Sequence, residues 1–184
     1  MTRQSNFRYY LRLTLTLFLI TAIVAALLGA VNAVTAGRIE SLRQERTQAA
    51  MREVLAAEDY VPAACDEPGV QAIHAAMRGG SLAGYVVEVA PAGFGGAIRM
   101  VVGVDLAGTV TGVSIVSMAE TSGLGDNAKK ESFRSQFVGG SGQLAVTKDG
   151  GTIDALTGAT VTSRAVTSGV NTAIAAAASA REAE

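Results

Sequence analysis

Residues 154–163, DALTGATVTS, are rich in hydroxyl side chains and precede a segment with helical periodicity. Serine and threonine often cap the first backbone N–H groups of a helix, and Thr162 or Ser163 could do so here. The same helix end also favours a phosphate group, because its N–H groups are unpaired and the helix dipole is positive there. Thr160 lies at or just before the expected first turn, where a phosphate ester on its hydroxyl would be stabilised. The residue types alone leave two interpretations open, ordinary capping and an anion site.

Several other kinds of chemistry lack the residues they need. The sequence has one cysteine, Cys65, and one histidine, His74, too few for a disulfide framework, a thiolate zinc site or a multi-histidine metal centre. The pattern G-x-S-x-G is absent, and no histidine is placed to activate Thr160 as a nucleophile. We interpret Cys65 as a loop thiol and His74 as a side chain on the surface of a short helix. From these missing residues we expect no catalytic residue and no metal. Beyond residue 36 the net charge is negative without a basic stripe, so we also expect no nucleic-acid partner.

The first 36 residues differ in charge and hydropathy from the rest of the chain. Residues 13–36 carry no charge, and as a helix rising about 1.5 Å per residue they would cross a hydrocarbon core of about 30 Å. Residues 1–12 contain three arginines and no acidic residue, so the positive-inside rule places them in the cytoplasm and the domain outside. A cleaved signal peptide is the alternative, but the apolar run exceeds the usual core of about 7–15 residues. We expect a retained, single-pass anchor in the cell membrane with an extracytoplasmic domain.

The periodicity of the remaining chain predicts a helical stalk followed by a domain. Residues 38–57 have apolar residues at near-helical spacing and continue the membrane helix, and residues 70–78 suggest a second, short helix. We assign residues 37–80 to a helical stalk and loop, and residues 81–184 to the domain. The elements expected in the domain are strands at 82–89, 97–105 and 110–118, a helical piece at 127–138, a hairpin at 144–156 and a helix at 162–180. The fold class is therefore α+β, with an antiparallel β-sheet packed by helices after one transmembrane helix.

The segment DALTGAT, residues 154–160, resembles the flavinylation motif D-x-x-[ST]-G-A-T of FMN-binding domains. In that family the last threonine is joined to FMN through a phosphoester, so the resemblance implies covalent FMN on Thr160. The resemblance also implies a cofactor-binding role for four other motif positions, Asp154, Thr157, Gly158 and Ala159. It extends to Thr162 in the hydroxyl-rich continuation.

A second segment, MAETSGLGDNAKK at residues 118–130, resembles the E-T-P-G-L-G loop of the G subunit of the Rnf electron-transport complex. The C subunit of the sodium-translocating NADH:quinone reductase has a similar loop. The matching positions are Glu120, Thr121, Gly123, Leu124 and Gly125. The glycines would let the backbone approach a flat ring, Leu124 offers an apolar face, and Glu120 could accept hydrogen bonds from flavin N–H or ribityl groups. For Lys129 and Lys130, a helix-surface position is the first interpretation and a phosphate contact the second.

With the membrane helix, the resemblance to the Rnf G subunit covers nearly the whole chain and implies an electron carrier without independent catalysis. FMN would accept and pass electrons within a membrane complex that couples ferredoxin:NAD electron transfer to ion translocation. The implied partners are the membrane and Fe–S subunits of that complex, the lipid bilayer, and a flavin transferase for maturation. Two alternatives stay open. One is a component like the C subunit of the quinone reductase or a stand-alone, membrane-tethered flavin shuttle, and the other is a non-redox, membrane-anchored binding module whose T-G-A-T is only a cap.

Overall fold

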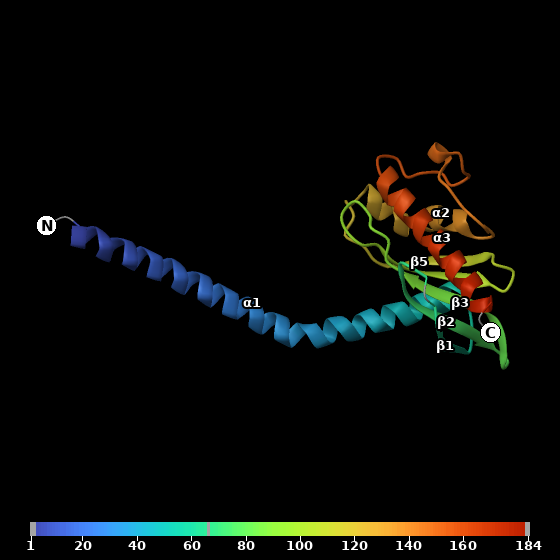
Figure 1. Ribbon diagram of the computed structural model, residues 1–184, viewed down its shortest axis with the longest axis horizontal. Coiled ribbons are helices and arrows are strands. Elements are labelled where there is room, and N and C mark those ends of the chain that lie inside the picture. Colours follow the sequence, from blue (N-terminus) through green and yellow to red (C-terminus); the bar gives the residue numbers. More distant parts are fainter. Residues whose placement is uncertain (1–2, 66, 183–184) are drawn as a thin grey trace. The chain divides into compact units, whose positions relative to one another are not determined.

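The computed structural model describes residues 3–65 and 67–182, and the chain divides into two units between Gln44 and Glu45. Its first element is the helix α1 (Arg3–Val54), which contains the charge-free run 13–36 (Figure 1). By length and composition this helix can cross a membrane, and its most apolar part is not buried within the protein, which fits a membrane anchor. The stalk helix expected after the anchor is confirmed as far as Val54, because α1 continues without interruption.

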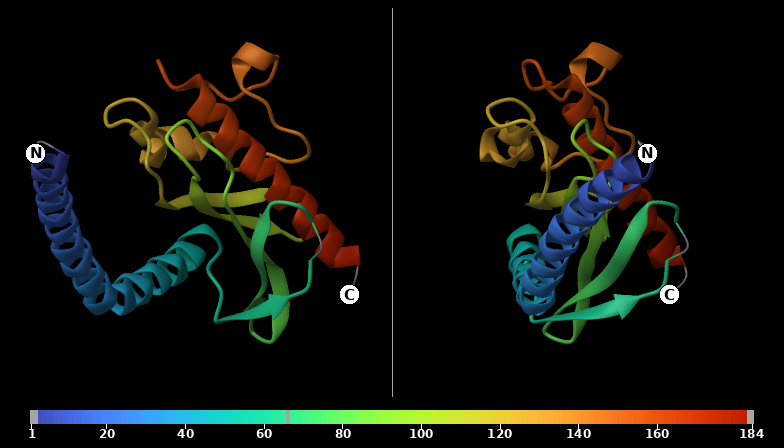
Figure 2. Two further views of the ribbon diagram at one scale, coloured as in Figure 1. Left: turned by 60° about the vertical axis from the view of Figure 1, so that its left-hand side comes forward. Right: turned by 90° about the vertical axis from the view of Figure 1, so that its left-hand side faces the viewer.

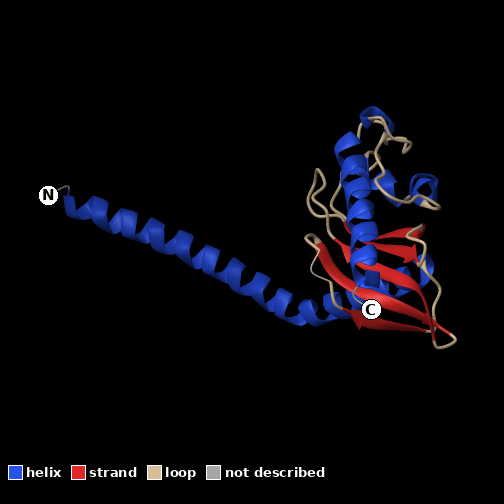
Figure 3. Ribbon diagram, turned by 45° about the vertical axis from the view of Figure 1, so that its right-hand side comes forward, coloured by secondary structure: helices blue, strands red, loops and turns tan. Residues whose placement is uncertain are grey.

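The second unit is built on an antiparallel sheet (Figure 3), and its five strands follow the order β1-β2-β3-β4-β5. Its strands are β1 (Asp59–Ala63), β2 (Val70–Arg78), β3 (Ser81–Val89), β4 (Arg99–Asp105) and β5 (Val110–Ser117). The three strands expected from the β-branched runs are β3, β4 and β5, each paired with its neighbour in sequence as a meander. The α+β class and the antiparallel sheet are therefore confirmed.

The helix expected at residues 70–78 is wrong, because this segment is the strand β2. Its sequence, VQAIHAAMR, is rich in residues with good helix propensity, but tertiary context overrides that propensity. Gly79 and Gly80 both have positive φ, +56° and +77°, and they form the tight turn that pairs β2 with β3. His74 consequently lies on a strand and not on a helix surface. Residues 59–78, expected in the stalk and loop, thus supply two strands of the sheet.

The hairpin expected at residues 144–156 is also wrong. Val146 and Ile153 form one isolated parallel bridge, and the chain between them contains the 3₁₀ helix η3 (Thr147–Asp149). Gly150, with φ of +85°, reverses the chain after η3, so KDGG is a turn as expected but does not join two strands.

Helical structure at residues 127–138 is confirmed, although it is broken into three short pieces. These are the 3₁₀ helix η1 (Gly125–Lys129), the helix α2 (Glu131–Arg134) and the 3₁₀ helix η2 (Ser135–Phe137). Lys130 has extended backbone angles and separates η1 from α2. Phe133 and Phe137 are both buried and pack edge to face, with ring centroids 5.4 Å apart.

Different helices cover the two faces of the sheet. The helix α3 (Thr160–Glu182) confirms the helix expected at 162–180 and lies along one face (Figure 2). There Val166, Val170 and Ala173 are fully buried in the main core with the valines of β3 and β4. The last turns of α1 cover the other face, in a second cluster of Ala50, Met51, Val54, Leu55, Ala76, Val86 and Val101.

Arg134 connects three segments on the α1 side of the sheet. Its Nη1 donates to Glu53 Oε1 at the end of α1 (2.7 Å) and to the carbonyl oxygen of Val113 in β5 (2.8 Å). Its Nε donates to the carbonyl oxygen of Lys129 at the end of η1 (2.9 Å). Ser114 donates a further hydrogen bond to Glu53 Oε2 (2.6 Å). One guanidinium thus links the end of the long helix to the sheet and to the segment that follows the 118–125 loop.

We expect Arg134→Met to lower the free energy of unfolding of the second unit by about 2 kcal/mol, because two carbonyl oxygens and a carboxylate lose a charged donor. Urea unfolding of the full chain in detergent, followed by near-UV circular dichroism, measures this. Arg52→Met, at an exposed position on α1, is the matched control. Equal unfolding free energies for the two variants would contradict the linking role.

Candidate functional site

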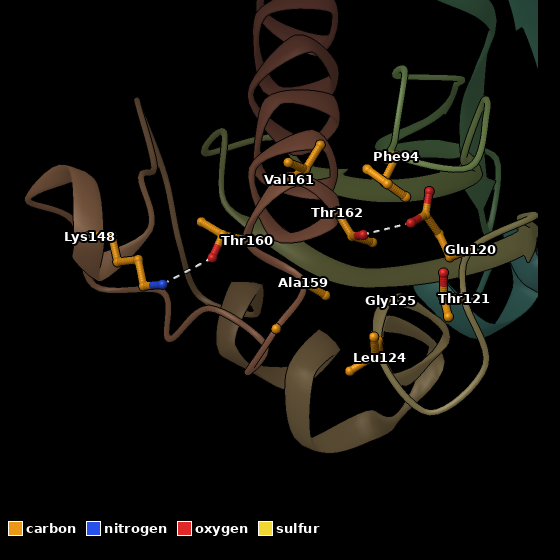
Figure 4. A pocket seen from close by; sticks show the side chains of 11 residues that line it. Phe94, Glu120, Thr121, Leu124, Gly125, Lys148, Ala159, Thr160, Val161 and Thr162 are labelled. Carbon is orange, nitrogen blue, oxygen red and sulfur yellow. Dashed lines mark hydrogen bonds between the residues drawn. The ribbon is translucent and has the colours of Figure 1, made fainter.

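A cavity of about 440 Å³ opens at the start of α3 (Figure 4). Four segments form it: the glycine-rich turn after β3, the loop after β5, η3 and the first turn of α3. The residues that line it are Phe94, Glu120, Thr121, Leu124, Gly125, Lys148, Gly158, Ala159, Thr160, Val161 and Thr162. Its volume lies in the range of small-molecule sites, roughly 300–1,000 Å³.

The carboxylate of Glu120 joins three of the segments around the cavity. Its Oε1 accepts a hydrogen bond from the backbone N–H of Gly95 (2.9 Å), and its Oε2 accepts one from the hydroxyl of Thr162 (2.7 Å). The side chain is half-buried. Both oxygens already have protein partners, so Glu120 positions the walls of the cavity.

Gly125 and Gly93 leave room for this carboxylate. A Cβ on Gly125 would lie 2.7 Å from both Glu120 Oε2 and Thr162 Oγ1, and a Cβ on Gly93 would overlap Glu120 Oε1. Any larger residue at either position would displace the carboxylate. The glycines of GFGG and GLG therefore have a packing role in the contacts that close the site.

The loop before α3 folds so that Thr160 is the first residue of the helix. Gly158 has φ of +75°, and a Cβ there would lie 3.1 Å from Leu124 Cδ2. The buried hydroxyl of Ser163 accepts a hydrogen bond from the N–H of Leu156 (2.9 Å) and donates to the carbonyl oxygen of Ala159 (3.0 Å). The interpretation of Thr162 or Ser163 as the N-cap is wrong, because both lie inside the first turn and bond elsewhere. Their hydroxyls are occupied, while that of Thr160 faces Lys148 at the cavity.

Lys148 approaches Thr160 from η3, and an ion pair holds η3 against α3. Lys148 Nζ donates to Thr160 Oγ1 at 3.0 Å (Figure 4). Arg164, one turn after Thr160, makes two hydrogen bonds to the carboxylate of Asp149, Nε to Oδ2 at 2.7 Å and Nη2 to Oδ1 at 2.6 Å. The hydrogen bond from Arg164 is the main reason that the pKa of Asp149 lies below its usual range. Burial acts in the opposite direction, and the charges of Arg164 and Lys148 lower the pKa further.

Exposed apolar side chains also line the cavity, and one of them, Phe94, lies beside Glu120 on the side away from Lys148 (Figure 4). Phe94, Leu124 and Val161 are 76%, 44% and 50% exposed. A cavity whose lining is mainly apolar with a few polar groups is typical of ligand sites. The arrangement offers Phe94 and Leu124 as apolar surface for a flat ring, with Glu120 beside them, and at Thr160 a hydroxyl next to the cation of Lys148. These residues fit the ring and the phosphate of FMN.

Most of the residues singled out from the sequence come together at the cavity. Those that line it are Glu120, Thr121, Leu124, Gly125, Gly158, Ala159, Thr160 and Thr162. Three others do not: Asp154 pairs through its backbone with Gln136, Thr157 is exposed, and Gly123 forms a turn with φ of +79°. Their contact with a cofactor stays a prediction.

Sequence reasoning missed Phe94, Lys148 and Val161. Phe94 and Lys148 lie in segments that indicate only turns, GFGG and KDGG, and Val161 directly follows the motif. Lys129, considered for a phosphate contact, pairs with Asp126 at 2.6 Å instead. Neither Lys129 nor Lys130 is among the described residues that line the cavity.

Comparison with known proteins points to the same region. The model of the FMN-binding domain family matches residues 93–175, a range that contains every cavity-lining residue. The G subunit of the Na⁺-translocating ferredoxin:NAD⁺ oxidoreductase complex of Acetobacterium woodii is 36% identical, over 93% of this chain and 93% of that protein. The G subunit of the ion-translocating oxidoreductase complex of Methanosarcina acetivorans is 32% identical, over 89% of this chain and 92% of that protein. A solved structure, the C subunit of the Na⁺-translocating NADH-quinone reductase of Parabacteroides distasonis, is 25% identical with a TM-score of 0.47, over 54% of this chain and 57% of that one.

We expect Glu120→Ala to free the glycine-rich turn at residues 93–96. The amide hydrogen of Gly95 should exchange with solvent about tenfold faster or more, because it loses a hydrogen bond to a charged acceptor. Hydrogen exchange followed by NMR or mass spectrometry measures this. Glu131→Ala removes an exposed carboxylate at the start of α2 and should leave Gly95 unchanged. Equal exchange in the two variants would show that Glu120 does not hold the turn.

We expect Arg164→Ala to raise the pKa of Asp149 toward its ordinary value, near 4. Because the folded-state pKa of Asp149 is lowered, the ion pair holds η3 at neutral pH and is lost as the pH falls through that lowered pKa. Titration of the Asp149 carboxyl carbon by ¹³C NMR gives the pKa in each variant. Lys148→Met, which removes only the weaker influence of a charge, should raise it less. An Asp149 pKa that is the same with and without Arg164 would rule out the ion pair in solution.

Proposed function

Because the chain belongs to the family of G subunits of ion-translocating oxidoreductase complexes, the Rnf complexes, we propose that it carries FMN covalently on Thr160. The observation that carries the proposal is the position of the Thr160 hydroxyl. It opens into the cavity at the first turn of α3, where helix N–H groups have no acceptor within the helix, and Lys148 Nζ lies 3.0 Å away. A phosphoester on this oxygen would have a cation and the positive end of a helix dipole beside it.

The redox chemistry would belong to the isoalloxazine ring of the flavin, and the protein would bind and orient it. Phe94, Leu124 and Val161 offer the apolar surface against which the ring would pack. Glu120 keeps the 93–96 turn and the loop after β5 against α3, so these walls stay at a fixed separation. The residues of the site would thus hold and orient the flavin, and we assign proton transfer to none of them.

We place the flavin domain on the outer side of the cell membrane, with α1 as its anchor. Residues 1–12 carry three arginines and no acidic residue, which favours a cytoplasmic N-terminus. Outside the cytoplasm a dissociated FMN would be lost, so a covalent bond suits this location. A flavin transferase would have to form the bond.

The electron partners of the proposed flavin are other membrane and Fe–S subunits of the same complex. The relative in Acetobacterium woodii is named for a Na⁺-translocating ferredoxin:NAD⁺ oxidoreductase complex. The likeness to it extends over 93% of both chains, including the membrane helix and the flavin domain. We therefore propose that this chain carries electrons in a complex that couples ferredoxin:NAD oxidoreduction to ion translocation.

The test is intact-protein mass spectrometry of denatured protein from cells that flavinylate other proteins. Wild type should gain the mass of FMN less one water, localised by fragmentation to Thr160. Thr160→Ala should lose all covalent flavin and remain folded, because its hydroxyl makes a single hydrogen bond within the described part of the chain, from a lysine at the surface. Thr152→Ala, an exposed threonine outside both the motif and the described lining of the cavity, should keep the flavin. Covalent flavin that survives in Thr160→Ala would overturn the assignment.

A further inference from the structure

Lys148 is the only cation among the described residues that line the cavity. Its Nζ lies 3.0 Å from Thr160 Oγ1, and this is the one hydrogen bond that its ammonium group makes within the described part of the chain. An ammonium group has three N–H donors, so two remain for another acceptor. The acidic group of the cavity, Glu120, has both oxygens engaged with Gly95 and Thr162 and does not compete for Lys148.

The backbone of η3 holds Lys148 in place from both sides. The N–H of Thr147 donates to the carbonyl oxygen of Ile153 at 2.8 Å, and the N–H of Gly151 donates to that of Val146 at 3.1 Å. Asp149, the next residue after Lys148, is held by two hydrogen bonds from Arg164. Arg164 lies four residues after Thr160 on α3, and Thr160 is the residue that Lys148 contacts. The ammonium group and the hydroxyl thus face each other from two segments, η3 and α3, that these hydrogen bonds hold together.

From this geometry we infer that Lys148 binds the phosphate of the ester on Thr160, and that the Asp149–Arg164 pair positions Lys148 for it. The inference rests on the proposed function and adds a residue that the motif resemblance does not contain. A phosphodiester on Thr160 Oγ1 would place its phosphorus one bond, and its anionic oxygens two bonds, beyond the atom that Lys148 already contacts. Lysine binds phosphate as a point charge through charge-assisted hydrogen bonds. Lys148 is therefore a cofactor-positioning residue, while Asp149 and Arg164 act through it.

The experiment compares wild type with Lys148→Met, Lys148→Arg and Lys130→Met, each expressed as the full chain with a flavin transferase. Lys130 is an exposed lysine outside the cavity and serves as the matched control. Mass spectrometry gives the fraction of each protein that carries covalent flavin, and ³¹P NMR of the flavinylated fraction reports the surroundings of the phosphorus. Because Lys148 is exposed, its substitution should leave the circular dichroism spectrum and the unfolding midpoint unchanged.

We expect Lys148→Met either to lose covalent flavin or to carry it with a shifted ³¹P resonance. This change in chemical shift from wild type should be much larger than the change in Lys130→Met. Lys148→Arg, which retains the positive charge, should restore attachment or move the resonance back toward wild type. Full attachment with an unchanged resonance in Lys148→Met would overturn the inference. So would a Lys148→Arg variant that behaves like Lys148→Met.

A separate variant tests whether the Asp149–Arg164 ion pair positions Lys148. Arg164→Ala keeps Lys148 but frees Asp149 and η3, so its ³¹P resonance should move in the same direction as that of Lys148→Met. If Arg164→Ala kept the ³¹P resonance of wild type, the Asp149–Arg164 pair would not position Lys148. A wild-type protein without any covalent flavin would instead refute the proposed function, and that result is distinct from all of these.

Discussion

The shape of the cavity depends on one carboxylate, that of Glu120, which accepts hydrogen bonds from two segments that are distant in sequence. Gly95 lies 25 residues before it and Thr162 lies 42 residues after it. Hydrogen bonds to a charged acceptor in a half-buried setting are stronger than those between neutral groups. The nearby glycines follow from this contact, because a Cβ on Gly125 or Gly93 would occupy the space of the carboxylate. The loop at residues 120–125 and the glycine-rich turn at residues 93–96 therefore belong to one contact, although they are distant in sequence.

The residues of the segment DALTGATVTS, 154–163, likewise have separate roles. Gly158 makes the turn, Ser163 closes the loop onto the first turn of α3, and Thr162 bonds to Glu120. Only Thr160 among these hydroxyls faces the lysine at the cavity. The cavity consequently has a hydroxyl and a cation at Thr160 and Lys148, and on its other side Phe94 and Leu124 together with Glu120 and Thr121. This arrangement matches a ligand with an anion at one end and a flat ring with polar edges at the other.

The sequence predicted those elements whose local pattern and tertiary role agree. The uncharged run in α1 was recognised by its length, and the β-branched strands and the apolar stripe of α3 by their period, and all were confirmed. β2 was missed because VQAIHAAMR resembles a helix until the Gly79-Gly80 turn pairs it with β3. Lys148 was missed for a different reason. Its importance comes from contact with Thr160 across the fold, and a turn sequence such as KDGG contains no sign of such a partner.

Covalent attachment of the cofactor, as proposed, would explain why the cavity is open to solvent. Phe94, at 76% exposure, and Val161, at 50%, would cover a ring only partly, so the site would hold free FMN weakly. The proposed bond to Thr160 would remove the need for tight binding, because an attached flavin would stay at a high effective concentration whatever its intrinsic affinity. The walls then need only orient the ring, and its outer edge can remain accessible to an electron partner. Retention by a bond and access for exchange are thus compatible in one shallow site, whereas a deep pocket that retained FMN by burial would screen the ring from its partners.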